Sequence, residues 1–122
     1  MAYDRSNVFA RILRGEIPCK RVFEDVHVLA FNDINPQTPT HILVIPKGEY
    51  VSSDDFVEKA SDAEIAAFMR AVGRIAREHG LAAPGYRILA NHGRDAHQEV
   101  PHFHVHIFVG RDLGRMIGKA PG

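Results

Sequence analysis

The sequence contains a single cysteine, Cys19, and no tryptophan among its 122 residues. One thiol cannot form an intrachain disulfide, which excludes a disulfide-stapled secreted scaffold and favours a reducing compartment. No apolar run approaches the roughly 20 residues that a membrane-spanning helix needs, and the first residues lack the apolar stretch of a secretory signal peptide. We therefore expect a cytoplasmic protein without a membrane partner.

The sequence also lacks an excess of charge of either sign. Lys and Arg together number 15, as do Asp and Glu, so the formal net charge is zero. Affinity for a polyanion such as duplex DNA comes from neutralising many phosphates, so this balance argues against nucleic acid as a partner. A small phosphorylated ligand, held by a few local donors, is still compatible with this composition.

The hydrophobic pattern predicts two helices. Residues 7–14 follow Ser6, a residue type that caps helices, and stop at Gly15. The second helix is expected from Ser61 to His79, because Ser-x-x-Glu has the spacing of a capping box and apolar residues then recur every three or four positions. Phe68 and Met69 are expected to lie in the core. Between the strands and this helix, residues 49–59 are polar and are expected to form a connection with local order around Phe56.

Short apolar segments bounded by turn residues predict five strands, at residues 22–24, 27–32, 41–45, 86–90 and 102–109. These strands come in consecutive groups and do not alternate with helices, which favours an antiparallel sheet and the α+β class. We expect residues 1–122 to form one domain, with residues 111–122 as a C-terminal tail.

Three histidines stand at alternate positions, His102, His104 and His106. A strand sends successive side chains to opposite faces, so this spacing puts three imidazoles on one side and Phe103 and Val105 on the other. Their Cα atoms would span about 13 Å, which is too far for all three to reach one zinc ion from a straight strand. Nucleophilic or acid–base chemistry fits the row best, with a two-histidine metal site or a solvated face as alternatives.

The run from His102 to Phe108 matches the pattern His-φ-His-φ-His-φ-φ, where φ is apolar, and resembles the signature of the histidine triad (HIT) superfamily. Residues 31–47 and the stretch Gly15-Glu16-Ile17-Pro18 are similar to the histidine triad nucleotide-binding (Hint) branch. This resemblance implies a HIT-like α+β domain with a five-stranded antiparallel sheet and a homodimeric assembly. It also implies a purine nucleoside phosphoramidate as substrate, with a purine nucleoside monophosphate as product.

The resemblance assigns roles to the histidines. It implies that His104 attacks the α-phosphorus of a nucleoside 5′-phosphoramidate and forms a nucleotidyl-histidine, which water then cleaves. His106 would contact the phosphate and assist proton transfer, and His102 and His41 would complete the network. A dinucleoside polyphosphate hydrolase or a nucleotidyl transferase would use the same triad. A nucleotide-binding scaffold with incidental hydrolysis is the alternative outside the enzymes.

The resemblance also implies a nucleotide site. Asp33 matches the carboxylate that binds ribose hydroxyls, Asn91 matches a polar residue beside the phosphate, and the backbone amides of Glu99 and Val100 would cradle phosphate oxygens. The family's apolar slot for the base corresponds here to Phe9, Ile12, Ile17, Phe31 and Ile34.

Two departures from the family pattern matter. Glu99 stands where many eukaryotic members carry a serine, and an ionised carboxylate repels phosphate, so we expect its side chain to turn away from the site. Some relatives hold zinc through a CxxC motif in the first helix. Here Asn7 and Ala10 occupy those positions, so no metal and no other cofactor is expected.

Overall fold

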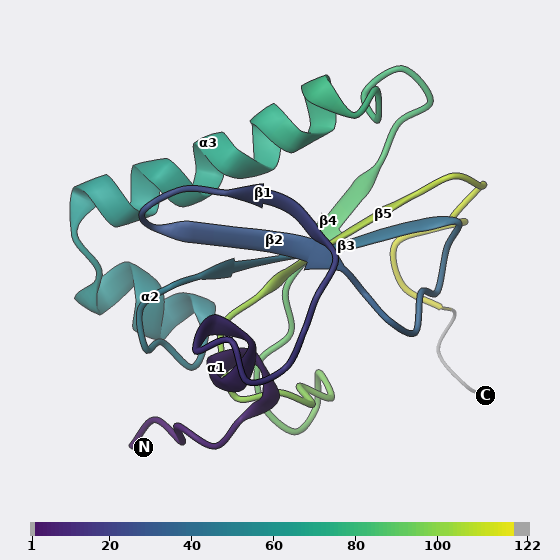
Figure 1. The fold of residues 1–122 in the computed structure, drawn as a ribbon. Helices are drawn as coiled ribbons and strands as arrows, with labels where there is room; N and C mark the ends of the chain where they lie inside the picture. Colours follow the sequence, from purple (N-terminus) through teal and green to yellow (C-terminus); the bar gives the residue numbers. More distant parts are fainter. Residues whose placement is uncertain (1, 119–122) are drawn as a thin grey trace.

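The computed structural model describes residues 2–118 of the chain. Its elements, in chain order, are α1 (Val8–Leu13), β1 (Arg21–Glu24), β2 (Val28–Asn32), β3 (Thr40–Pro46), α2 (Ser53–Lys59), α3 (Asp62–Glu78), β4 (Arg87–Leu89) and β5 (Val105–Val109). The strands form one antiparallel sheet in the order β1-β2-β3-β5-β4 (Figure 1). The α+β class and the five-stranded antiparallel sheet are confirmed. Residues 119–122 of the expected tail lie outside the described residues.

The sheet separates two apolar clusters of unequal size. The helices α2 and α3 cover one face, where Val28, Val44 and Ile107 pack against Phe68 and its neighbours on α3. The short helix α1 lies on the opposite face (Figure 1). There it covers a smaller cluster with Phe9 against Leu29, Phe31, Leu43 and Ile45. Because α1 is short, much of this second face stays open beside it.

The structure contains a third helix, Ser53–Lys59, where the sequence predicted a polar connection with local order around Phe56. The hydroxyl of Ser52 accepts a hydrogen bond from the backbone N–H of Asp55 and caps α2. Phe56, the buried residue of this helix, contacts the rings of Phe68 and Phe103. The prediction of two helices was therefore wrong by one, because seven mostly polar residues with one buried phenylalanine give no clear helical period.

The last strand is shorter than predicted. It begins at Val105, and the residues before it bond to loops instead of a neighbouring strand. The N–H of Phe103 donates to the carbonyl of Tyr50, 2.7 Å away, and the N–H of His102 donates to the carbonyl of Val100. Two of the three histidines, His102 and His104, therefore lie on irregular backbone before β5. The directions of their side chains do not follow from the alternation of a β-strand.

The helix ends follow local side-chain chemistry. Ser61 and Glu64 form the predicted capping box of α3. At α1 the cap is Asn7, one residue after the predicted Ser6, because the Asn7 side chain accepts from the N–H of Ala10. Within residues 2–118, no helix combines the length and the apolar character that crossing a membrane would need.

Candidate active site

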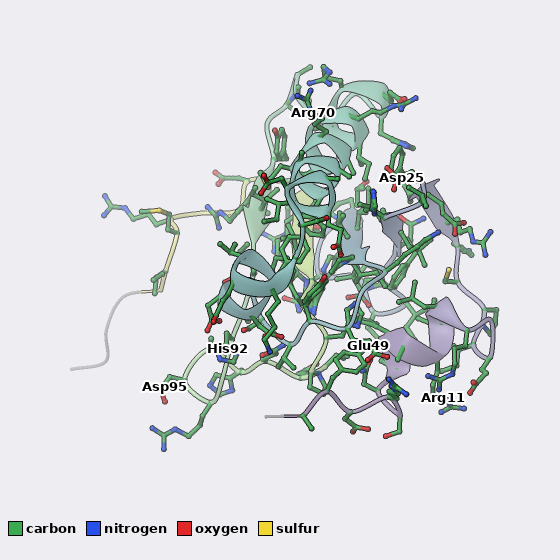
Figure 2. All side chains as sticks on the ribbon, turned by 90° about the vertical axis from the view of Figure 1, so that its left-hand side faces the viewer. Arg11, Asp25, Glu49, Arg70, His92 and Asp95 are labelled. Atoms are coloured by element: carbon green, nitrogen blue, oxygen red, sulfur yellow. The ribbon has the colours of Figure 1, made fainter. Side chains whose placement is uncertain are left out.

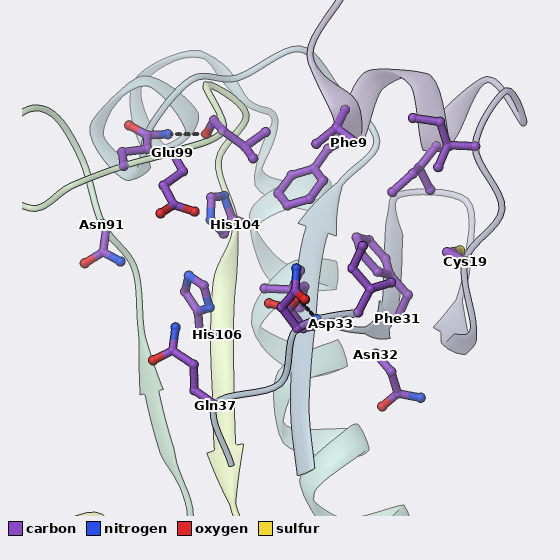
Figure 3. Close-up of a pocket in the computed structure, with 18 of the residues that line it drawn as sticks. Phe9, Cys19, Phe31, Asn32, Asp33, Gln37, Asn91, Glu99, His104 and His106 are labelled. Atoms are coloured by element: carbon purple, nitrogen blue, oxygen red, sulfur yellow. Dashed lines mark hydrogen bonds between the residues drawn. The ribbon is translucent and has the colours of Figure 1, made fainter. Parts of the chain in front are cut away.

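A cavity of about 690 Å³ opens on the face of the sheet that carries α1 (Figure 3). It is bounded by α1, the end of β2, the middle of β3 at Leu43, the loop before β5 and the start of β5. Eleven of the thirteen predicted site residues line it: Phe9, Ile12, Ile17, Phe31, Asp33, Ile34, Asn91, Glu99, Val100, His104 and His106. The other two, His41 and His102, are buried at its margin, with 2% and 0% of their surfaces exposed.

Hydrogen bonds fix which nitrogen of His104 carries the proton. Its Nδ1 lies 2.7 Å from the backbone carbonyl oxygen of His102, and a carbonyl can only accept, so Nδ1 is the protonated nitrogen. The other ring nitrogen, Nε2, therefore keeps a free lone pair. His104 lines the cavity, and the edge-to-face contact of its ring with Phe9, at 4.9 Å between centroids, holds the ring in place. The result is an uncharged nitrogen nucleophile in an apolar setting.

His102 acts as the support beneath His104. Its Nε2 lies 2.8 Å from the carbonyl oxygen of Pro46 and donates to it. Its Nδ1 consequently accepts, and the partner is the hydroxyl of Tyr3 at 2.5 Å. Both ring nitrogens of this fully buried histidine are satisfied, and neither faces the cavity. The His102 ring holds a backbone turn whose carbonyl orients the nucleophile.

A second chain of donors runs from the loop after β2 to His106. The backbone N–H of Gln37 donates to Nδ1 of His41, so the proton of His41 is on Nε2. That Nε2 lies 2.9 Å from Nδ1 of His106, which must therefore accept. His106 then carries its own proton on Nε2. The fixed tautomer of His41 thus gives His106 a hydrogen-bond donor beside the lone pair of His104.

All four histidines are neutral at pH 7 for one main reason, which is burial. Burial lowers the pKa of His102 to about 4 and that of His106 to about 4. For His106, repulsion from His104 and His41 in their protonated forms lowers the pKa further. The pKa values of His104 and His41 also fall through burial. For His104 the carbonyl of His102 and the carboxylates of Asp33 and Glu99 oppose that fall.

Asp33 sits at the mouth of the cavity, directly after β2. One carboxylate oxygen accepts the N–H of Asn35, at 2.9 Å, and the other lies 3.5 Å from Nε2 of His41. Figure 3 shows the side chain between Phe31 and His106. A carboxylate held from one side by its own turn still has lone pairs for an external diol.

The apolar part of the cavity lies on the other side of Asp33 from His106 (Figure 3). Phe9 and Phe31 meet edge to face there, with ring centroids 5.6 Å apart. Ile34 is 88% exposed, so its place is at the rim and the slot stays open to solvent on that side. A flat apolar ring that enters the slot would cover the apolar surfaces of Phe9 and Phe31 that face the cavity.

The prediction for the Glu99 side chain was wrong. Figure 3 shows its carboxylate on the cavity side, between Asn91 and His104, where we expected it to turn away. The neighbours explain this direction. The amide of Gln98 is tied to the carbonyls of Val51 and Val100, and Val100 packs against the apolar cluster. The loop therefore presents Glu99 to the open cavity, where it is exposed to solvent.

Asp33, His41 and His106 form one group with spacing suitable for a metal ion, because one ligand atom from each lies within 4.8 Å of the others. The same atoms already satisfy one another as hydrogen-bond donors and acceptors, through the bond between His41 and His106. A metal ion would have to displace the proton of His41 and break that bond. The donor set therefore fits a hydrogen-bond relay as well as it fits a metal.

Sequence reasoning missed two residues of the site. Gln37 lines the cavity, and its backbone N–H sets the tautomer of His41. Its place two residues before Pro39, in a turn directly before the strand of His41, was the available signal. Tyr3 reaches His102 across a separation of 99 residues, and no local pattern in the sequence indicates such a contact.

Comparison with known proteins places this geometry in a family. The model of the HIT domain matches residues 14–113. The chain belongs to the HIT family. A HIT family hydrolase from Legionella pneumophila superposes with a TM-score of 0.84 at 38% identity, covering 93% of this chain and all (100%) of that one. A histidine triad protein from Clostridium difficile gives a TM-score of 0.82 at 39% identity, covering 95% and 100%.

Among curated HIT relatives, an uncharacterised 13.2 kDa HIT-like protein of Azospirillum brasilense is 68% identical over 96% of both chains. The purine nucleoside phosphoramidase of Escherichia coli is 40% identical over 90% of this chain and 92% of that protein. The family, its fold and its hydrolase chemistry therefore agree with the resemblance seen in the sequence. This HIT protein and the named phosphoramidase align over nearly their whole lengths.

Proposed function

We propose that this HIT protein belongs to the Hint branch and is a purine nucleoside phosphoramidate hydrolase. The observation that carries the proposal is the pair of fixed tautomers in the cavity. His104 offers a bare Nε2, and His106 offers an N–H beside it. An enzyme that attacks phosphorus and releases an amine needs these two groups, a nucleophile and a proton donor. The 40% identical phosphoramidase of Escherichia coli supports the choice of substrate class.

The nucleotide is oriented by the rest of the cavity. The purine enters the apolar slot of Phe9, Phe31 and Ile34, and Asp33 accepts hydrogen bonds from the ribose hydroxyls. Ile12 and Ile17 complete the slot. The phosphate then lies over His104 and His106, close to Asn91 and to the backbone amides of Glu99 and Val100. This arrangement holds the phosphorus near the lone pair of His104.

In the first step the Nε2 lone pair of His104 forms a bond to phosphorus while the P–N bond to the leaving amine breaks. In the substrate complex the anionic phosphate holds His106 as the imidazolium, and the amine nitrogen takes the proton from its Nε2, so that His106 returns to its neutral form. The His104 ring, now joined to the nucleotide through phosphorus, becomes cationic. The carbonyl of His102 stabilises this charge by accepting the hydrogen bond from Nδ1. The pKa of His106 is about 4 without substrate, and an anionic phosphate beside it would raise that pKa toward neutrality.

In the second step water attacks the same phosphorus. The neutral His106 accepts a proton from the water, the bond between phosphorus and His104 breaks, and the nucleoside monophosphate leaves. No step requires a metal ion, so incubation with EDTA should leave turnover unchanged. We take residues 1–122 as one HIT domain with residues 111–122 as its tail. A cytoplasmic location remains a prediction, which cell fractionation checks.

The homodimer is also part of the proposal. The strand β4 ends the sheet on one side, and its neighbourhood carries exposed apolar side chains, Tyr86 and Ile88. Met69, an apolar position of α3, is likewise 55% exposed. Exposed apolar side chains beside a free strand edge are typical of a subunit contact. Sedimentation of the wild type should give a dimer, and Ile88→Lys should shift it toward the monomer.

The enzymatic proposal is tested with adenosine 5′-phosphoramidate and guanosine 5′-phosphoramidate as substrates. The wild type should release the monophosphates, with diadenosine polyphosphates cleaved much more slowly. His104→Ala should lower kcat by at least about 10³-fold while AMP still binds, because the ribose and base contacts remain. His79→Ala is the matched control, since His79 is an exposed histidine at the end of α3. Turnover retained in His104→Ala would overturn the nucleophile assignment.

A further inference from the structure

The side chain of Gln98 joins three segments of the chain beside the cavity. Its Nε2 donates to the carbonyl of Val51, at 2.7 Å, and to the carbonyl of Val100, at 2.9 Å. Its Oε1 accepts from the backbone N–H of Gly93, at 3.4 Å, and lies 3.0 Å from Nδ1 of His92. An amide oxygen only accepts, so Nδ1 of His92 carries the proton that completes this fourth bond.

Gln98 lines the cavity but has no hydrogen-bonding capacity left for a ligand. A primary amide offers two N–H donors and two acceptor lone pairs, and the four bonds use all of them. The two carbonyls on one side and the backbone N–H on the other also fix which end of the amide is nitrogen. Any effect of Gln98 on a ligand therefore passes through the backbone segments that it holds together.

The loop that Gln98 holds, residues 91–98, contains a residue in an uncommon backbone conformation. His97, directly before Gln98, has a φ of 57°, in the left-handed region that residues other than glycine rarely adopt. Two backbone bonds close the loop, from the N–H of His97 to the carbonyl of Arg94 and from the N–H of Gln98 to the carbonyl of Gly93. Such a conformation persists where the surroundings hold it, and the side-chain bonds of Gln98 supply that support.

The segment after Gln98 carries the two backbone amides that the proposed function assigns to the phosphate. Among the described residues 2–118, no backbone carbonyl accepts from the N–H of Glu99 or of Val100, so both donors are available to a ligand. Glu99 and Val100 line the cavity, and so does Asn91 at the other end of the loop. Because the Gln98 side chain bonds to both ends, it sets how far apart these cavity-lining groups lie.

The carbonyl of Val100 connects this loop to the nucleophile. Besides the bond from Gln98, it accepts the N–H of His102 at 2.8 Å. The carbonyl of His102 in turn accepts from Nδ1 of His104 and orients its ring. Gln98 and His102 thus bond to the same oxygen, which has a lone pair for each. The free amides and the lone pair of His104 are held at a fixed spacing as a result.

We propose that Gln98 is a positioning residue for the phosphate, which holds the N–H groups of Glu99 and Val100 where they meet an anionic phosphate. This inference rests on the proposed function, because it takes the phosphate site from it. Donors that are fixed before the ligand arrives need no ordering when it binds. Gln98 therefore strengthens the binding of a ligand that carries a phosphate. It does not affect the binding of a nucleoside, whose base and ribose contact α1 and the end of β2.

The experiment compares AMP with adenosine, which lacks only the phosphate. The readout is the ratio of their dissociation constants, measured by calorimetric titration in each variant, so that changes in the base slot cancel. The wild type should bind AMP more tightly. Gln98→Met keeps the length of the side chain but cannot reproduce the four bonds. It should lower the preference for AMP by about tenfold, the scale of one charge-assisted hydrogen bond, with the affinity for adenosine unchanged.

Two further variants calibrate this result. His92→Ala removes one of the four bonds and should lower the preference for AMP less than Gln98→Met does. Arg94→Gln is the matched control, because the Arg94 side chain is 93% exposed in the same loop and pairs only with Asp95 among the described carboxylates. Figure 2 shows Asp95 and His92 at the surface of the molecule. The preference of Arg94→Gln for AMP should equal that of the wild type.

An unchanged preference for AMP in Gln98→Met would overturn the positioning role. An equal loss of affinity for AMP and adenosine would show a purely structural role and would overturn it as well. Adenosine phosphoramidate separates these failures from failure of the proposed function. If the wild type cleaves it and the preference does not change, only the role of Gln98 is wrong. If the preference falls as expected and the wild type does not cleave it, only the proposed reaction is wrong.

Discussion

Nε2 of His41 lies 2.9 Å from Nδ1 of His106, and the proton between them belongs to His41. This assignment follows because the backbone N–H of Gln37 occupies the other nitrogen of His41. His41 therefore positions the tautomer of His106 without touching the substrate. The relationship connects β3 to β5 across the sheet and decides which nitrogen faces the cavity.

The first prediction concerns His41. His41→Leu should lower kcat by up to about 10²-fold, the lower end of what a positioned general acid contributes, because His106 is then free to place its proton on Nδ1. His41→Gln supplies an N–H donor and should lose much less. The affinity for AMP should change little in both variants. Equal kcat values for the Leu and Gln variants would contradict the positioning role.

The second prediction concerns Asp33 and the ribose. Asp33→Ala should weaken AMP binding by about 1–3 kcal/mol, the scale of a charge-assisted hydrogen bond. Calorimetric titration with AMP and with 2′,3′-dideoxy-AMP provides the measurement. The unmutated protein should prefer AMP, and Asp33→Ala should bind both ligands equally. If the unmutated protein already bound both with the same affinity, Asp33 would not contact the ribose.

The third prediction concerns the contact between Tyr3 and His102. Tyr3→Phe removes the only donor to the buried Nδ1 of His102 within residues 2–118, so the free energy of unfolding should fall by about 1–3 kcal/mol. Tyr86→Phe is the control, because Tyr86 is 42% exposed and should change stability by less than about 0.5 kcal/mol. Urea unfolding of both variants measures the difference, and equal losses would count against the contact.

The fourth prediction concerns stability at mildly acidic pH. The pKa of His102 is about 4 in the folded protein and 6.5 in a free histidine, so between these values the unfolded chain binds a proton that the folded chain does not. Stability should therefore fall as the pH drops below 6.5, by about 1.4 kcal/mol per pH unit for this group. His106, also near 4, adds a similar amount.

Urea unfolding at pH 7, 6 and 5 measures this slope above the range in which most carboxylates titrate. His102→Asn should reduce this slope by up to about 1.4 kcal/mol per pH unit, the contribution of one group, while His79→Ala removes an exposed histidine and serves as the control. A full slope in His102→Asn would show that other groups cause the loss of stability.

The pH dependence of kcat/KM should differ from that of an enzyme whose nucleophile is an exposed histidine. Because burial lowers the pKa of His104, the free enzyme keeps its nucleophile unprotonated below pH 6.5. The value of kcat/KM for adenosine phosphoramidate should therefore not decline as the pH falls from 8 to 6. A decline centred at pH 6.5 would mean that His104 titrates as an exposed histidine does.

Local patterns in the sequence were sufficient for most of the sheet. Alternating apolar residues in β2 send Leu29 and Phe31 to one face and Val28 and Ala30 to the other, and the structure has them so. The same patterns failed where one buried side chain organises polar residues, as Phe56 does in α2. They also failed for Met69, which fits the helical period of α3 but is 55% exposed.

The sequence by itself determined the row of three histidines, the strand that follows it and the family, because a period of two and a rare motif are both local properties. Only the tertiary structure decided what each imidazole does. The tautomers depend on partners far along the chain, such as Tyr3 and Pro46 for His102 and His41 for His106. The direction of Glu99 and the pairing of Arg87 with Phe108 beside His106 likewise depend on how loops and strands meet in space, which no spacing in the sequence records.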